Sequence, residues 1–436
     1  MKRITKRIAL SMALILCLSV CLCLLPSCTK SENGDGGGNK GASYTLTVWG
    51  AQEDQTMLRE MCEAFAAANP QNRYTFQYGV QGEGEAANVV LNDVTAGPDV
   101  YSFASDQIYR LYAGGALARL GGDIETEVKA ANSEGSVDAS TVTVGGEDHL
   151  YAYPMAADNC YFLYYDKRVF TDESALNNLD DMLDVAEAAG KKVLFKLNDD
   201  GWYLSSFFFA IPELKYEVEY NEGMAEKSVS INFNNAAGVD VMRSLRHYVN
   251  RDGMVVQTDD SKIIAAFTPN AAGKTEAAAA VSGTWNAAAI KSLLGDNMGV
   301  CKLPTATIGG EEIQLSGFMG YKLVGVNGYS KNKGEAHKLA AWLTGEQNQL
   351  KRYEMRGIAP TNKVVAEDSR VKADPIIATV LEQAKHNRAQ KGVPANYWTP
   401  MASLITPIVA AKANGAVVTD AQLKEYLDAL CAQIRK

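Results

Sequence analysis

The stretch YTLTVWGAQEDQTMLREMCEAF, residues 44–65, decides the fold class. Its first six residues alternate apolar and polar side chains, which is the period of a half-buried β-strand. From Asp54 to Asn69 the period becomes helical and places five apolar side chains on one face. These are Met57, Leu58, Met61, Cys62 and Phe65. The stretch therefore predicts a strand followed by an amphipathic helix.

The same alternation continues downstream. Residues 74–78 are expected to form a second strand, 83–96 a helix, and 99–103 a third strand after the break at Gly97-Pro98. Strands that alternate with helices imply a mostly parallel sheet covered on both faces, an α/β class. In such sheets ligands bind beyond the carboxyl ends of the strands. Residues 49–54 and 103–106, which pair an aromatic with a carboxylate, follow two of these ends.

A second series of elements follows in the rest of the chain. The expected strands are 161–165, 192–197, 299–303 and 321–326, and the expected helices are 235–250, 333–344 and 420–434. The short run Ala277–Ala280 suits a strand or a helix. A folded body of about 390 residues exceeds what one hydrophobic core covers, so we expect two lobes.

The N-terminus has the features of a targeting signal. Four basic residues precede an apolar run over 8–25, which ends at Leu25-Pro26-Ser27-Cys28. We interpret 1–27 as a lipoprotein signal peptide, Cys28 as the lipidated first residue of the mature chain, and 28–43 as a flexible tether. The alternative is an uncleaved transmembrane anchor, for which the run is just long enough. Either interpretation places the body outside the cytoplasmic membrane.

Charge and composition exclude several partners. Removing 1–27 takes away four basic and no acidic residues, which changes the net charge from −9 to −13. An acidic body without basic clusters argues against nucleic acid and against an anionic membrane surface as a partner. The remaining cysteines show no paired spacing, and the histidines show no metal-ligand spacing, so no metal or other cofactor is expected. They are Cys62, Cys160, Cys301, Cys431, His149, His247, His337 and His386. The disulfide state of the cysteines stays open.

Several motifs in a fixed order carry a resemblance. They are Gly97-Pro-Asp-Val-Tyr-Ser-Phe-Ala-Ser-Asp106, Tyr112-Ala-Gly-Gly-Ala-Leu117, Tyr151-Ala-Tyr-Pro-Met-Ala-Ala-Asp158, Phe162-Leu-Tyr-Tyr-Asp-Lys167, Gly283-Thr-Trp285 and Arg356-Gly-Ile-Ala-Pro360. With them the chain resembles the bacterial extracellular solute-binding proteins, and within these the maltose- and maltodextrin-binding proteins. The resemblance runs from about Tyr44 to the C-terminus.

The resemblance implies a two-lobe, type II periplasmic-binding-protein-like fold joined by a multi-crossing hinge. The N-terminal lobe would comprise 44–157 plus 304–360, and the C-terminal lobe 158–303 plus 361–436. It further implies a monomer that binds malto-oligosaccharides between closing lobes and delivers them to the permease subunits of an ABC importer. With the anchor on Cys28, this protein would sit on the extracellular face of the cytoplasmic membrane.

The resemblance also assigns candidate ligand-binding residues. They are Trp49, Asp54, Phe103, Asp106, Asp158, Trp202, Tyr203, Trp285, Tyr397 and Trp398. Two departures concern the exact sugar: Met401 occupies the position expected for the last aromatic, and the lysine usual beside the first-loop aspartate is absent. Flat aromatic rings suit the C–H face of a pyranose, and each carboxylate can accept hydrogen bonds from two hydroxyls.

Each of these residues also has a structural alternative. Trp49 at a strand end suits a core position, Asp106 after Ser105 suits a helix cap, and Asp158 suits a loop charge. We expect Trp342 and the run Phe207–Phe209 to pack in the interior rather than to contact ligand.

Two rival functions remain open. An anchored glycoside hydrolase would also use carboxylates and aromatics, but no motif selects a proton donor, and neither a nucleophile elbow nor a P-loop is present. A binder of another oligosaccharide or small solute would share the fold. Phosphate ligands would favour basic residues at the strand ends, where this chain has acids.

Overall fold

The computed structural model describes residues 41–435. The predicted signal peptide, Cys28 and nearly all of the predicted tether lie outside the described residues. Residues 42–436 form one compact unit. Within 41–435 no helix combines the length and the apolar character needed to cross a membrane.

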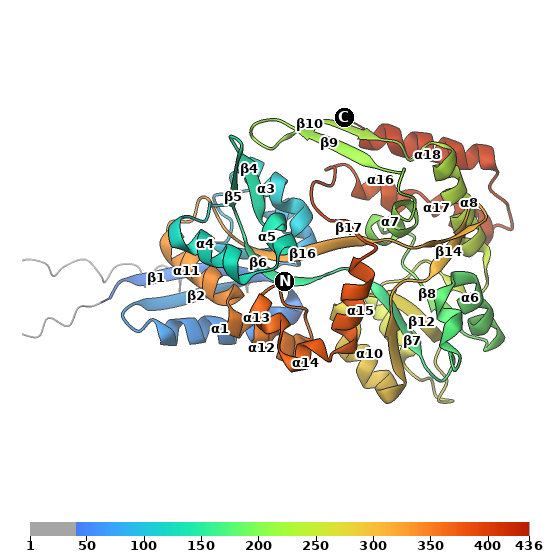
Figure 1. The fold of residues 1–436 in the computed structure, drawn as a ribbon, viewed down its shortest axis with the longest axis horizontal. Helices are drawn as coiled ribbons and strands as arrows, with labels where there is room; N and C mark the ends of the chain where they lie inside the picture. Colours follow the sequence, from blue (N-terminus) through green and yellow to red (C-terminus); the bar gives the residue numbers. More distant parts are fainter. Residues whose placement is uncertain (1–40, 436) are drawn as a thin grey trace, which may run out of the picture. The chain divides into compact units, whose positions relative to one another are not determined.

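Two mixed sheets organise this unit (Figure 1). The first has the order β17-β16-β3-β1-β2, with β6 paired to β16. Its strands are β1 (Ser43–Gly50), β2 (Arg73–Val80), β3 (Val100–Ala104), β6 (Tyr153–Asn159), β16 (Phe318–Val326) and β17 (Arg388–Ala389). The second has the order β11-β8-β12-β7-β13. Its strands are β7 (Phe162–Asp166), β8 (Lys192–Leu194), β11 (Met254–Val255), β12 (Ala277–Ser282) and β13 (Met298–Cys301).

Both sheets are less parallel than the sequence predicts. In the first, β1 pairs parallel with β2 and β3, but β16 runs antiparallel to β3 and β6. In the second, β8 pairs parallel with β11 and β12, whereas β7 runs antiparallel to β12 and β13. The chain passes from the first sheet to the second between β6 and β7, and it returns between β13 and β16. Its direction reverses at these two passages, so the four strands pair antiparallel.

Three hairpins lie outside the sheets. They are β4 (Thr141–Val144) with β5 (Glu147–Leu150), β9 (Tyr216–Tyr220) with β10 (Glu226–Ile231), and β14 (Thr305–Ile308) with β15 (Glu311–Gln314). The β14–β15 hairpin belongs to the segment 304–360 that the sequence assigns to the first lobe. Its apolar side chains Ala306 and Ile308 nevertheless pack in the core of the second sheet.

Helices cover the sheets on both faces. The longer ones are α1 (Gln55–Ala68), α4 (Gly122–Ala131), α6 (Leu179–Ala188), α7 (Gly201–Phe209), α8 (Ala236–Asn250), α9 (Asp260–Phe267), α10 (Ala287–Leu294), α11 (Lys333–Thr344), α12 (Glu346–Arg356), α15 (Pro375–Ala384), α17 (Thr406–Ala413) and α18 (Asp420–Ile434). The shorter ones are α2 (Ala86–Val90), α3 (Ile108–Ala113), α5 (Glu134–Ala139), α13 (Lys363–Ala366), α14 (Ser369–Lys372) and α16 (Trp398–Ser403).

The apolar pattern of the sequence explains the two cores. Met57, Met61 and Phe65 of α1 are buried against the first sheet, as their helical spacing predicts. The alanines at 277–280 form the buried central strand β12, where small side chains leave room for helices on both faces. Phe207–Phe209 pack in the second core, which confirms the prediction for this run.

Candidate functional site

Two tryptophans that are far apart in the sequence lie side by side. Trp202 is on the first turn of α7, and Trp285 is in the 3₁₀ helix Thr284–Asn286 that follows β12. Their ring centroids are 6.0 Å apart, and the planes are tilted by 37°. The carboxylate of Asp200 accepts hydrogen bonds from the backbone N–H groups of Trp202 and Tyr203 and so fixes the start of α7. Both residues are half-buried, so part of each stays exposed to solvent.

The predicted carboxylate Asp106 joins this pair through one amide. Gln390, directly after β17, donates from Nε2 to Asp106 Oδ1 at 3.1 Å. Its Oε1 accepts from Trp202 Nε1 at 3.0 Å and from Asn159 Nδ2 at 2.9 Å. Three segments that are far apart in the sequence therefore meet at one side chain, and Asp106, Trp202 and Trp285 share one site.

Asp106 stands in the first turn of the 3₁₀ helix Ser105–Gln107 after β3. Its carboxylate accepts a hydrogen bond from Gln390, so a place at a helix start and a place in the site coexist. Burial raises the pKa of its carboxyl to about 7, against hydrogen bonds from Gln390 and Trp398 and the charge of Arg110. Trp398, a predicted ligand residue on α16, is thus adjacent to Asp106.

Hydrogen bonds fix the loop that carries Trp285 on both sides of this residue. Trp285 Nε1 donates to Asp260 Oδ1 at 3.1 Å, and Asn286 donates to the same oxygen at 2.7 Å. On the other side, Thr284 Oγ1 donates to Asp158 Oδ2 at 2.8 Å. This bond ties the Trp285 loop to β6, the strand that leads the chain from the first sheet to the second.

Asp158 itself is 0% exposed and contacts Lys322 of β16, with Nζ 3.7 Å from Oδ2. Burial opposes the charge of Lys322, but Asp158, Glu83 and Asp54 hold its pKa above the ordinary value. In this arrangement Asp158 positions the Trp285 loop, and a direct contact with ligand stays a prediction. Its burial also rules out the alternative of a solvent-facing loop charge in this structure.

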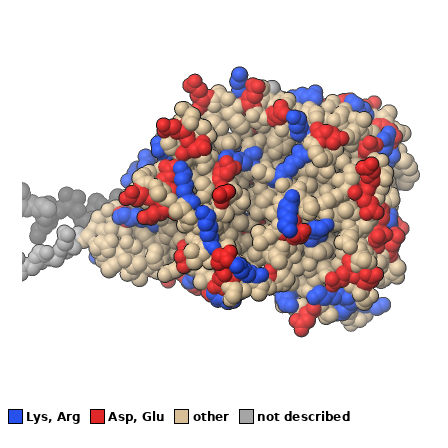
Figure 2. Space-filling view, viewed as in Figure 1, with Lys and Arg blue, Asp and Glu red and all other residues tan. Residues whose placement is uncertain are grey.

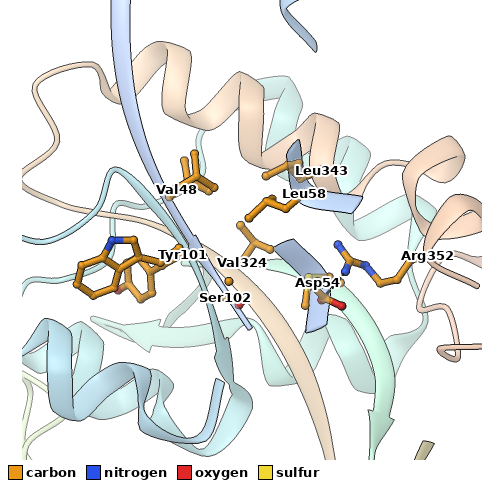
Figure 3. Close-up of a pocket in the computed structure, with 12 residues that line it drawn as sticks. Val48, Asp54, Leu58, Tyr101, Ser102, Val324, Leu343 and Arg352 are labelled. Carbon is orange, nitrogen blue, oxygen red and sulfur yellow. Dashed lines mark hydrogen bonds and ion pairs between the residues drawn. The ribbon is translucent and has the colours of Figure 1, made fainter. Parts of the chain in front are cut away.

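Asp54 belongs to a different cluster. Its carboxylate lies 2.9 Å from Arg352 Nη1 and 3.4 Å from Arg356 Nε, so it holds α12 against the start of α1. Figure 3 shows Arg352 directed at Asp54 beside the apolar side chains of Val48 and Leu58. The cavity there measures about 20 Å³, which is room for about one water molecule and not for a sugar.

The remaining predicted residues divide by burial. Phe103 and Tyr397 are 0% exposed in core clusters, and Tyr203 is nearly as buried, so none of the three presents a ring to solvent in this structure. The Tyr397 hydroxyl is hydrogen-bonded to Ser205 instead. Trp49 is half-buried against Gly79 and lines the cavity of Figure 3 rather than the Trp202–Trp285 pair. The prediction that these residues contact ligand finds no support in their placement.

Sequence reasoning missed Gln390, Asn159 and Asp260. Gln390 is separated from Asp106 by 284 residues and from Trp202 by 188 residues, and no local pattern marks it. Asn159 follows Asp158 in the crossing motif, so its neighbour was a usable signal.

Residues 41–435 contain neither a disulfide bond nor a group of side chains that could bind a metal ion. Cys62, Cys160, Cys301 and Cys431 are free thiols, and this part of the chain holds no cluster of metal-binding side chains. On the face in Figure 2 acidic and basic side chains are interspersed, without one large patch of a single sign. Rings, amides and one carboxylate suit a neutral, polyhydroxylated ligand.

Known proteins share this architecture. A solved structure with acarbose is 33% identical, covers 90% of this chain and 98% of its own, and has a TM-score of 0.77. A maltodextrin-binding protein of L. casei, solved without ligand, is 21% identical over 90% of this chain and 99% of its own, with a TM-score of 0.71. The galactooligosaccharide-binding protein of Bacillus subtilis is 26% identical over 325 residues, which are 73% of each chain.

These likenesses confirm the two-lobe type II fold of maltose-binding-protein-like proteins. The first sheet and the second sheet are therefore the centres of the two lobes, and the site joins Asp106 of the first to Trp202 and Trp285 of the second. A family model matches residues 60–379, well over half of the chain. The chain belongs to the family of bacterial extracellular solute-binding proteins.

Proposed function

We propose that this chain is the substrate-binding lipoprotein of a carbohydrate ABC importer and that it binds malto-oligosaccharides between its two lobes. The observation that carries the proposal is the convergence of Asp106, Trp202 and Trp285 from opposite lobes on one partly open site. The family consists of binding proteins, so the chain is not an enzyme, and the glycoside hydrolase alternative is set aside.

The chemistry of the site supports a sugar. Trp202 and Trp285 offer adjacent aromatic faces for the C–H side of pyranose rings, and two adjacent rings suit a ligand with more than one sugar unit. The Asp106 carboxylate accepts from hydroxyls more strongly than a neutral acceptor does. Micromolar binding corresponds to about −8 kcal/mol, and one central tryptophan contributes about 2 kcal/mol of it.

Three relatives bear on the choice of sugar, and they favour two classes. The structure with acarbose and the maltodextrin-binding protein favour malto-oligosaccharides. The relative from Bacillus subtilis favours galacto-oligosaccharides, which form the second candidate. Both classes are neutral oligosaccharides, so they would use the same rings and carboxylate.

The anchoring part of the proposal rests on the sequence before residue 41. The basic start, the apolar run and Leu25-Pro26-Ser27-Cys28 support lipidation of Cys28 outside the cytoplasmic membrane. Incorporation of a labelled fatty acid into the protein in cells, and its loss in Cys28→Ser, tests this part. Label that persists in Cys28→Ser contradicts it.

Calorimetric titration of the mature protein tests the function. Maltose, maltotriose, longer malto-oligosaccharides and galacto-oligosaccharides are compared, with xylo-oligosaccharides as a further class. We expect micromolar binding of maltotriose, and a ligand at a hundred times its Kd adds about 2.7 kcal/mol of stability. Tighter binding of galacto-oligosaccharides selects the second candidate, and no binding of any saccharide rejects both.

A matched pair of tryptophan variants places the site. Trp285→Ala is expected to weaken maltotriose binding about thirtyfold, because it removes one stacking face. Trp342→Phe is the control, since Trp342 packs on the first core and donates from Nε1 to the Met61 carbonyl 2.9 Å away. It should lower stability and leave affinity unchanged. Equal loss of affinity in both variants would place the sugar elsewhere.

A further inference from the structure

The side-chain amide of Gln390 is buried where the two lobes meet. Gln390 is 5% exposed, and both Oε1 and Nε2 of its amide form hydrogen bonds with side chains of the site. Its main chain is held equally firmly: its N–H donates to the Met319 carbonyl at 2.8 Å, and its carbonyl accepts from Ser105 Oγ at 2.9 Å. Ser105 directly precedes Asp106, so the backbone of Gln390 is fixed to the segment that carries the carboxylate.

The chemistry of its partners dictates how the amide points. An indole N–H only donates, and an ionised carboxylate only accepts. Trp202 therefore requires the carbonyl end of Gln390 at any pH, and the ionised form of Asp106, which predominates above about pH 7, requires the amino end. A flipped amide would lose both hydrogen bonds. Asn159 Nδ2 donates a second hydrogen bond to the same carbonyl oxygen of Gln390.

The surroundings leave space for this arrangement. Gly320 of β16 faces the Gln390–Asn159 pair, and a Cβ at Gly320 would lie 2.6 Å from Asn159 Nδ2 and 2.8 Å from Gln390 Oε1. Side chains larger than hydrogen at position 320 would therefore displace the hydrogen-bonded pair.

We propose that Gln390 is a positioning residue of the sugar site, whose amide orients the Asp106 carboxylate of one lobe and the Trp202 indole of the other toward the same oligosaccharide. This inference deepens the proposed function and rests on it. In the closed arrangement the sugar then contacts an acceptor and a stacking ring that are held in alignment, so less ordering is needed there. Gln390 acts through these two groups and needs no contact with the sugar.

Three substitutions of similar length separate the contributions. Gln390→Met removes both ends of the amide and is expected to weaken maltotriose binding about tenfold or more. Gln390→Glu keeps an acceptor for Trp202 but places a second carboxylate against Asp106. Gln383→Met is the matched control, because Gln383 is a fully buried amide that bonds Leu303, Leu315 and Asn387 outside the site. It should destabilise the fold and keep the affinity within about twofold.

The pH profile of Gln390→Glu distinguishes positioning from simple support of the fold. Two facing carboxylates share one proton at lower pH, so this variant should recover affinity as the pH falls. The other groups that face Asp106 are Arg110 of α3, Trp398 of α16 and Tyr216 of β9. Burial raises the pKa of Tyr216, so its hydroxyl does not titrate in this range. A flat profile in Gln390→Glu overturns the assignment.

A ligand-free measurement keeps the inference independent of the sugar. The indole N–H resonance of Trp202, assigned with Trp202→Phe, should shift and exchange faster in Gln390→Met but not in Gln383→Met. If no saccharide binds the unmodified protein, the proposed function fails, and the resonance alone decides whether Gln390 orients Trp202. An unchanged resonance, or unchanged affinity in Gln390→Met, overturns the inference.

Discussion

At the scale of single residues, Asp106 carries a charge that its surroundings oppose. Burial raises the pKa of its carboxyl to about 7, although Gln390, Arg110 and Trp398 favour the ionised form. A sugar hydroxyl donates to the ionised carboxylate, so bound sugar lowers the pKa of Asp106. We therefore expect affinity for maltotriose to increase as the pH rises through about 7 and expect a proton to be released on binding. Calorimetry in two buffers of different ionisation enthalpy measures that release.

The same pKa acts on folding with the opposite sign. Because the folded-state pKa of Asp106 lies above its unfolded value, the stability that this group contributes is complete below the unfolded pKa and is lost as the pH rises through about 7. Asp106→Asn removes both effects: it should bind more weakly than the unmodified protein, with an affinity independent of pH in this range. A pH-dependent affinity that persists in Asp106→Asn assigns the titration to another group.

At the scale of elements, the β9–β10 hairpin connects the lobes. The hairpin extends from the second lobe toward the first (Figure 1). Its base packs in the second core, while Met224 at its tip packs against the cluster of the first sheet. Tyr220 of β9 meets Tyr109 of α3, with ring centroids 4.8 Å apart. An aromatic pair contributes about 1 kcal/mol, so we expect Tyr220→Ala to accelerate sugar dissociation about fivefold, measured by stopped-flow fluorescence.

A neighbour on the same strand provides the control. Glu217 of β9 is exposed and pairs with Lys215 at 2.6 Å, so Glu217→Ala should leave the dissociation rate unchanged. Equal rates in Tyr220→Ala and in the unmodified protein would show that the hairpin does not restrain the closed form.

The elements themselves were largely predictable, because their patterns are local. The predicted helix 333–344 is observed as α11, and the predicted strand 44–49 falls within β1. The helix expected over 83–96 ends early, at Val90 of α2. The Asp93 carboxylate accepts from the backbone N–H groups of Thr95 and Ala96 and thereby stabilises a turn in place of further helix.

The site was only partly predictable, because its contacts are not local. Asp106, Trp202 and Trp285 were found through family motifs and converge as expected. Asp54 was assigned to ligand, but its partner Arg352 lies 298 residues away and gives no local signal. Phe103 stands in a strand whose residues are all buried, and alternation alone did not reveal that both faces of β3 are covered.

At the scale of the whole molecule, the division of the site between lobes predicts a change of conformation. A ligand shifts two states only by the difference in its contacts with each of them. Moving the population from mostly open to mostly closed needs about 5.5 kcal/mol of that difference. Micromolar binding supplies about 8 kcal/mol, which suffices if the sugar contacts Trp202 and Trp285 mainly in the closed arrangement, in which Gln390 joins Asp106 to Trp202.

Small-angle scattering measures this change directly. We expect saturating maltotriose to lower the radius of gyration of the mature protein, because the Asp106–Gln390–Trp202 contacts hold the lobes together around the ligand. Trp285→Ala should require about thirtyfold more sugar to reach the same compact state, because it loses affinity while the Asp106–Gln390–Trp202 hydrogen bonds remain. An unchanged radius of gyration at calorimetrically confirmed saturation would contradict this prediction. The sugar would then bind one lobe alone, and the hydrogen bonds of Gln390 would hold the lobes together without a bridging sugar.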